Sequence, residues 1–180
     1  MKFLTYRTIV AQGEEADLCY TLHNQLFLDK DGTIYLVPRY FETDGYTIPY
    51  WLAWLGGGKK KWDMRPAVGH DFDCKYHQSI IVNLTEEELR SKGYLLHKEK
   101  KIGESVLIIP ICEDIPIKYL SVVKTTFNQA NSKFKRMMKA TGQLKAWRVN
   151  MMRLAVNFNV GWAFSGKTKI NLEKLYNSVI

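Results

Sequence analysis

The sequence has no run of apolar residues approaching the ~20 that an α-helix needs to cross a bilayer. Its N-terminus lacks the long apolar stretch and the small-residue cleavage site of a signal peptide. Its three cysteines, Cys19, Cys74 and Cys112, have wide spacings that fit neither a disulfide framework nor a Cys-x-x-Cys metal site. We therefore expect a protein with no transmembrane segment, in the reducing environment of a cytoplasm.

Several catalytic signatures are also missing. The chain has no Gly-x-Ser-x-Gly elbow, no phosphate-binding loop and no His-Glu-x-x-His pair, which excludes those forms of hydrolase and nucleotide site. The formal net charge of +8 favours an acidic or phosphate-bearing partner. No nucleic-acid reader motif accompanies this charge, so nucleic acid is not the partner that we expect.

The composition is that of one globular domain spanning residues 1–180. Of the 180 residues, 46% are hydrophobic and 24% are charged, enough to build a core without metals or disulfides. Alternating apolar residues in the β-rich part, 1–45, predict strands over 3–10, 18–28 and 33–41. The Asp-Gly at Asp31-Gly32 predicts a tight hairpin turn between the last two strands.

The rest of the chain has mainly helical patterns. A helix is predicted over 64–78, and the helical region 116–180 is predicted to begin with a helix from Pro116 to Ala140, followed by a second helix over 144–164. The fold class is therefore α+β, with a small N-terminal antiparallel sheet packed against a mainly helical C-terminal half.

The segment between these two parts contains two local signals. Thr85 and Glu88 have the spacing of a capping box, which predicts a helix that Gly93 ends. The apolar runs 94–100 and 105–111 then predict a second β-hairpin.

Chemically versatile side chains are concentrated in the helix predicted over 64–78. His70, Cys74 and His77 lie on one face at 3.6 residues per turn, and all three are zinc-ligand types. The alternative is structural, with a core-facing histidine, a small buried thiol and a histidine near the helix end. We favour the structural alternative, because a helical zinc site normally takes ligands from a second element.

The His70-Asp71 pair supports a different chemistry. His70 could act as a general base, because the ordinary pKa of histidine lies near neutrality. Asp71 could hold a hard cation such as calcium or magnesium through oxygen. Adjacent helical residues point about 100° apart, so the pair would line a cleft rather than grip one atom. The structural alternative is that Asp71 accepts backbone N–H groups and His70 satisfies a buried carbonyl.

A loop before this helix is the second candidate region. Asp44 could add a cation ligand, and Gly45 and Thr47 could contact a substrate beside it. An aspartate in an Asp-Gly turn also commonly caps its own turn, which needs no function.

Together these motifs resemble a domain-of-unknown-function family that is common in bacteriophage genomes. That family carries a Phe-x-Thr-Asp-(Gly or Ala)-Ser-x-Pro loop, then a helical His-Asp-x-x-Tyr, then an Asp-x-x-Phe in a later helix. The resemblance makes residues 79–115 an insertion and covers most of the chain. The matching residues here are Phe41-x-Thr43-Asp44-Gly45-x-Thr47-Ile48-Pro49, His70-Asp71-Phe72 and Asn131-x-x-Phe134.

The family pattern in turn is similar to small calcium-dependent secreted phospholipases with a helical His-Asp pair. The resemblance implies that His70 is the base, that Asp71 and Asp44 are cation ligands, and that residue 131 supports the histidine. Two positions depart from the pattern, since Cys74 replaces the family tyrosine and Asn131 replaces the later aspartate. An asparagine can orient an imidazole but supplies no charge, so a weakened or inactive site is expected.

The favoured hypothesis is a phage-encoded hydrolase, metal-dependent through calcium or another divalent cation, acting on an envelope lipid or cell-wall component. The alternative is a virion or tail-associated structural protein that keeps a non-catalytic version of the site and contacts other virion proteins. Exposed aromatic side chains among Tyr50, Trp51, Trp54 and Trp62 would favour that alternative. The expected location is the host cytoplasm, or the virion for an assembled protein. A basic nucleic-acid-binding factor using Lys59–Lys61 and the face formed by Lys135, Arg136 and Lys139 is the least supported hypothesis.

Overall fold

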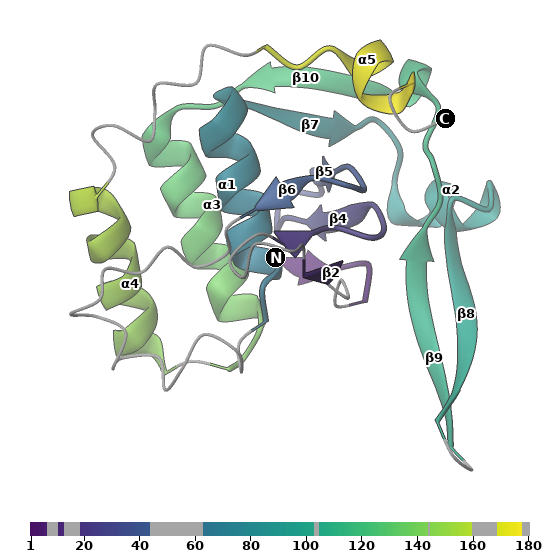
Figure 1. Ribbon diagram of the computed structural model, residues 1–180, viewed down its shortest axis with the longest axis horizontal. Coiled ribbons are helices and arrows are strands. Elements are labelled where there is room, and N and C mark those ends of the chain that lie inside the picture. The colour runs from purple at the N-terminus through teal and green to yellow at the C-terminus, as the bar shows by residue number, and fades with distance from the viewer. Residues whose placement is uncertain are drawn as a thin grey trace.

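An antiparallel sheet of five strands forms the centre of the molecule (Figure 1). The computed structural model describes residues 1–6, 11–12, 19–43, 63–102, 105–143, 145–159 and 169–177. In spatial order the strands of the sheet are β1 (Lys2–Phe3), β4 (Gln25–Leu28), β5 (Ile34–Val37), β7 (Gln78–Val82) and β10 (Leu120–Lys124). Three short strands, β2 (Ala11–Gln12), β3 (Cys19–Tyr20) and β6 (Glu42–Thr43), pair separately.

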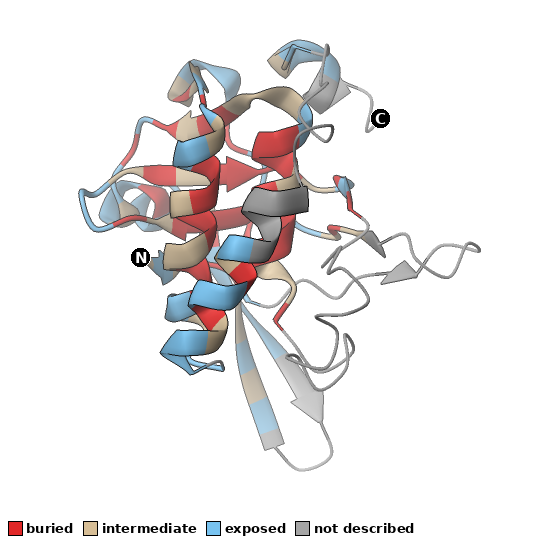
Figure 2. Cartoon of the chain, turned by 90° about the vertical axis from the view of Figure 1, so that its left-hand side faces the viewer, coloured by how far each residue is buried: buried red, intermediate tan, exposed pale blue. Residues whose placement is uncertain are grey.

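Two long helices, α1 (Arg65–Tyr76) and α3 (Phe127–Ala140), pack together and cover one face of this sheet (Figure 1). That face carries Phe27, Tyr35 and Ser79. Phe27 pairs with Tyr35, and Tyr35 pairs with Ile81. Ser79 lies two residues before Ile81 and so on the same face of β7. Most residues of α1 are buried, and α3 has buried residues on one side and exposed residues on another (Figure 2). The functional candidates on α1 therefore lie at a helix–helix interface.

The remaining helices lie around this centre. Helix α4 (Ala146–Asn159) packs against α3, while α2 (Glu86–Ser91) lies at the base of the hairpin formed by β8 (Leu95–Ile102) and β9 (Ser105–Cys112). The hairpin projects away from the body (Figure 1). A 3₁₀ turn, η3 (Ile117–Tyr119), leads into β10, and α5 (Leu172–Asn177) follows α4 in sequence. In the described part of the chain, no helix is long and apolar enough to cross a membrane.

The opposite sheet face is also buried. Leu26, Leu36 and Ile80 pair across β4, β5 and β7 and are at most 1% exposed. They belong to the same buried cluster as Leu89 of α2 and Leu95 of β8. The sheet is therefore covered on both faces, which explains why its strands are apolar on both sides.

Several local predictions are confirmed. The turn at Gly32, which has φ 86°, joins β4 and β5 as an antiparallel hairpin. Both hydrogen bonds of the predicted capping box form at Thr85, and α2 ends next to Gly93 at φ 75°. The predicted second hairpin is β8–β9, and the helix predicted over 64–78 is α1.

The helix predicted from Pro116 is wrong in its first ten residues. Pro116 precedes only the 3₁₀ turn, and residues 120–124 form β10, which pairs along its whole length with β7. The β-branched pair Val122-Val123 suits a strand, and pairing with β7 satisfies backbone groups that no local signal reveals. Thr126 instead caps the helix, which begins at Phe127, and the side chain of Thr126 forms a capping box with Gln129.

Because β10 belongs to the central sheet, the arrangement of the domain also differs from the expected one. The class is α+β, but the sheet takes β7 and β10 from the middle and later parts of the chain, so helices and strands are interspersed. Strand β7 lies within residues that the resemblance assigned to an insertion, while α2 and the β8–β9 hairpin lie beside the sheet. The predicted strands 18–28 and 33–41 are shorter than expected, and Tyr40 takes a left-handed φ of 62°.

Candidate functional site

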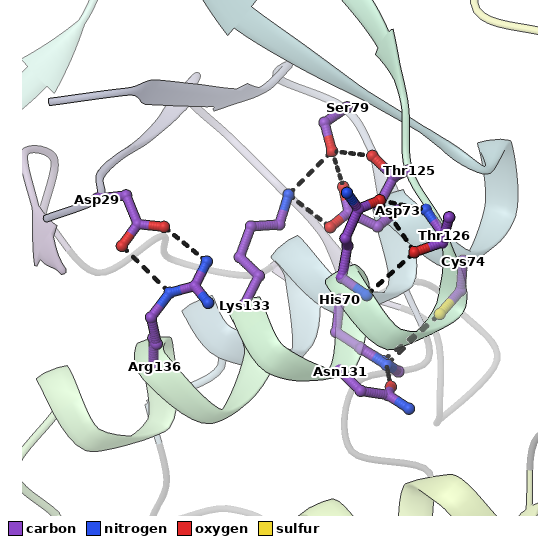
Figure 3. Close-up of polar contacts among 11 residues, drawn as sticks. Asp29, His70, Asp73, Cys74, Ser79, Thr125, Thr126, Asn131, Lys133 and Arg136 are labelled. Carbon is purple, nitrogen blue, oxygen red and sulfur yellow. Dashed lines mark hydrogen bonds and ion pairs between the residues drawn. The ribbon is translucent and has the colours of Figure 1, made fainter. Parts of the chain in front are cut away.

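The central contact of the site joins α1 to α3. His70 Nε2 lies 2.8 Å from Asn131 Oδ1, and both residues are buried (Figure 3). Asn131 lies one turn into α3, in a position set by the capping box at Thr126. Because an amide oxygen only accepts hydrogen bonds, His70 must donate from Nε2. This contact fixes the orientation of the ring and leaves Nδ1 as the atom available for proton transfer.

Asp71 lies next to Nδ1 of the His70 ring. Its Oδ1 is 3.8 Å from His70 Nδ1, which is an ion-pair distance but too long for a direct hydrogen bond. Its Oδ2 accepts a hydrogen bond from the hydroxyl of Thr43. The structure thus brings His70, Asp71 and Asn131 together in one place.

The predicted loop residues Asp44, Gly45 and Thr47 lie outside the described residues, as does the aromatic group of residues 50–62. Thr43, the residue directly before Asp44, is buried and bonded to Asp71. This contact places the start of the predicted loop at the His70-Asp71 site.

The pKa of His70 reflects two opposing effects. Burial of the ring favours the neutral form and lowers its pKa. The neighbouring Asp71 and Cys74 act in the other direction and outweigh burial, so the pKa is raised to about 10. The imidazole therefore carries a proton on both ring nitrogens at neutral pH in this arrangement, and it must lose one of them before it can act as a base.

Cys74 contacts His70 in a geometry unsuited to a nucleophile–base pair. Its Sγ lies 3.5 Å from Nε2 and 3.7 Å from Nδ1, so the sulfur is nearly equidistant from the two ring nitrogens. A thiol that donates along the lone pair of one ring nitrogen would lie much farther from the other. The sulfur therefore packs against the ring and is not in line for proton transfer.

The zinc alternative also lacks a complete ligand set. His77 ends α1 in the left-handed conformation, with φ 51°, and its backbone N–H bonds to Asp73 O. Among the described residues, no group of three or more histidine, cysteine, aspartate or glutamate side chains is placed to hold a metal ion. This leaves Asp71 as a single carboxylate in the described part of the site.

Sequence reasoning missed a buried ion pair next to this site. Lys133 Nζ lies 2.5 Å from Asp73 Oδ2 and 3.0 Å from Ser79 Oγ, and it lies over the ring of Tyr35 at 4.1 Å (Figure 3). Lysine is rarely buried, so the sequence gives no sign that Lys133 points inward.

The hydroxyl of Ser79 completes the network around this ion pair. It donates to Asp73 Oδ1 at 2.7 Å and lies 2.6 Å from Thr125 Oγ1, which must then donate to it. Although Ser79 and Lys133 have the spacing of a nucleophile and its base, Asp73 stabilises the charged amine. The network is therefore a structural link between α1, α3 and the sheet.

Comparisons of the chain with protein-family models, with curated proteins and with solved structures give no match. The resemblance to the phage family and to the phospholipases stays a prediction carried by the loop and the His70-Asp71 pair.

Proposed function

We propose that this protein is a phage-encoded hydrolase in which His70 is the general base and Asn131 positions it. The observation that carries the proposal is the 2.8 Å contact between His70 Nε2 and Asn131 Oδ1. A buried amide that fixes one ring nitrogen leaves the other for a water molecule, as general-base catalysis requires. The proposed substrate is an ester or amide in an envelope lipid or a cell-wall component.

In the proposed reaction, neutral His70 takes a proton from water at Nδ1 while the water oxygen bonds to the substrate carbonyl. The bond between the carbonyl carbon and the leaving group then breaks, and the same proton passes from His70 to the departing atom. Asp71 holds the ring from the Nδ1 side, and Thr43 fixes the carboxylate of Asp71.

Asp71 also has the chemistry of a ligand for a hard cation. Its side chain is partly exposed, and carboxylate oxygens are the ligands that calcium prefers in proteins. A calcium ion bound there would polarise the substrate carbonyl. One carboxylate does not make a calcium site, so the proposal assigns Asp44 as a second ligand.

Metal titration and substrate hydrolysis test the proposal together. Isothermal calorimetry with calcium, magnesium and zinc should give saturable binding that Asp71→Asn abolishes. Glu87→Gln, which removes an exposed carboxylate from α2, should bind as the wild type does. Hydrolysis of phospholipid and peptidoglycan should fall at least ~100-fold in His70→Gln. Absence of both cation binding and hydrolysis would overturn the proposal.

A second candidate is a virion or tail-associated structural protein, and the β8–β9 hairpin is the feature that favours it. Val106 and Ile108 are more than half exposed on a hairpin that projects from the body. An isolated two-stranded ribbon with exposed apolar side chains is stabilised when another chain covers it. The double variant Val106→Thr/Ile108→Thr should then abolish assembly with virion proteins while leaving the monomer folded.

A further inference from the structure

A cavity of about 390 Å³ lies between α3 and the sheet, apart from the His70 site. Strands β5, β7 and β10 and one side of α3, from Asn128 to Arg136, supply its lining, and neither His70, Asp71 nor Asn131 takes part. A cavity of this volume is in the range that holds small-molecule ligands.

The charges around the cavity are arranged in two layers. Lys124, Lys133 and Arg136 line it, and none of the described residues that line it is acidic. The carboxylates that pair with two of these cations lie behind them, since Asp29 and Asp73 are almost fully buried. Each ion pair therefore points its positive end toward the cavity, and a ligand there meets cations first.

Arg136 retains donors that can reach a ligand. Its Nε and Nη2 bond the two oxygens of Asp29 at 3.1 and 2.6 Å (Figure 3). This arrangement leaves Nη1 without a bond among the described residues and fixes the plane of the guanidinium group.

Three further side chains complete the recognition set. Lys124 is exposed and has no ion pair among the described residues, so its charge is not compensated locally. Burial raises the pKa of Tyr35, which keeps its hydroxyl protonated as a hydrogen-bond donor. Lys133 contributes its charge, because Asp73, Ser79 and the ring of Tyr35 already surround its amine.

We propose that this cavity binds the phosphate group of a small phosphorylated compound, with Arg136, Lys124 and the Tyr35 hydroxyl as its donors. Phosphate suits the site better than a carboxylate, because it has more acceptor oxygens and a larger negative charge to meet several donors. The inference is independent of the hydrolase proposal, since it uses none of the same side chains.

The test is a titration by calorimetry and by amide NMR shifts, with glycerol 3-phosphate, inorganic phosphate and phosphatidylglycerol vesicles as probes. Wild type should bind glycerol 3-phosphate saturably, with shifts centred on residues 123–136. Lys124→Gln and Arg136→Gln should each weaken binding about tenfold or more, as expected for loss of a charge-assisted hydrogen bond. Binding of vesicles in addition would assign the phosphate to a lipid headgroup, and its absence would assign it to a soluble compound.

Lys139→Gln is the matched control, because it removes one exposed charge from the same helix outside the cavity. Its affinity should equal that of the wild type. Lys124→Gln tests the site even if Arg136→Gln fails to fold, since Lys124 has no described ion pair. Absence of saturable binding by glycerol 3-phosphate and by vesicles, or an equal loss in Lys124→Gln and Lys139→Gln, would overturn the proposal.

Discussion

Replacing Lys133 with methionine should destabilise the protein more than its position in α3 suggests. The change removes the 2.5 Å ion pair with Asp73, the 3.0 Å bond to Ser79 and the contact with the ring of Tyr35. Methionine is close to lysine in length and helix propensity, so the cavity and helix contributions are small. The dominant effect is the charge of Asp73, which is left without its cation at 1% exposure.

Breaking a buried pair by removing one partner costs about 3–5 kcal/mol of the free energy of unfolding. For a chain of this size the corresponding loss in Tm is roughly 6–20 °C. Urea unfolding followed by circular dichroism, at pH 7, measures the free energy directly. Lys139→Met, on the exposed side of the same helix, should change it by about 0.5 kcal/mol or less.

The double variant Lys133→Met/Asp73→Asn sharpens this test. Neutralising Asp73 removes the unpaired charge, so the double variant should be less destabilised than the sum of its two single variants. A cost below about 1 kcal/mol for Lys133→Met, or exact additivity in the double variant, would refute the reasoning that Asp73 depends on Lys133.

Four further outcomes are expected. Since the folded pKa of His70 is raised to about 10, its contribution to stability is fully present below the unfolded value near 6.5 and is lost as the pH rises through about 10. Tm measured from pH 6 to 10 should therefore fall more in wild type than in His70→Gln. A titration of the His70 ring by NMR with a midpoint at or below 6.5 would contradict this. The free energy of unfolding of Gly69→Ala, measured in urea, should lie within about 1 kcal/mol of the wild-type value, because the gain in helix propensity offsets a 2.9 Å contact with the flexible end of Met137. Gly69→Val should be clearly less stable. Thr126→Ala should cost about 1 kcal/mol through loss of the α3 cap, again by urea unfolding, and Thr126→Ser should retain most of it. Cys74→Ala should keep any hydrolase activity within about tenfold of wild type, because the sulfur is not in line with either ring nitrogen; a loss comparable to that in His70→Gln would show that the thiol takes part.

Local signals in the sequence were sufficient where the contacts that decide the structure are local. The turn at Gly32 and the capping box at Thr85 need only residues three or four positions apart, and both form as predicted. β10 forms instead by pairing with β7, some forty residues earlier. No local signal around Val122 reveals that partner, so the local pattern predicts a helix there. The sequence of a strand does not specify which distant strand it pairs with.

In the candidate site too, some residues could be predicted from the sequence and others could not. His70 and Asp71 stand out because titratable residues cluster there, and the resemblance pointed to Asn131 as the support of the histidine. The structure places Asn131 at 2.8 Å from the ring. Lys133 could not be predicted, because a lysine in a helix is ordinarily assigned to the solvent face.

The cross-links between α1 and α3 have a consequence for motion. His70–Asn131 and Asp73–Lys133 join the same two helices at different heights, and the missing side chain of Gly69 leaves room for Met137 of α3. A slide of one turn, about 5.4 Å, would separate both pairs at once and leave Asp73 charged and unpaired. The two helices should therefore move as one rigid body, so the distance between His70 and Asn131 should stay fixed in any motion of the domain.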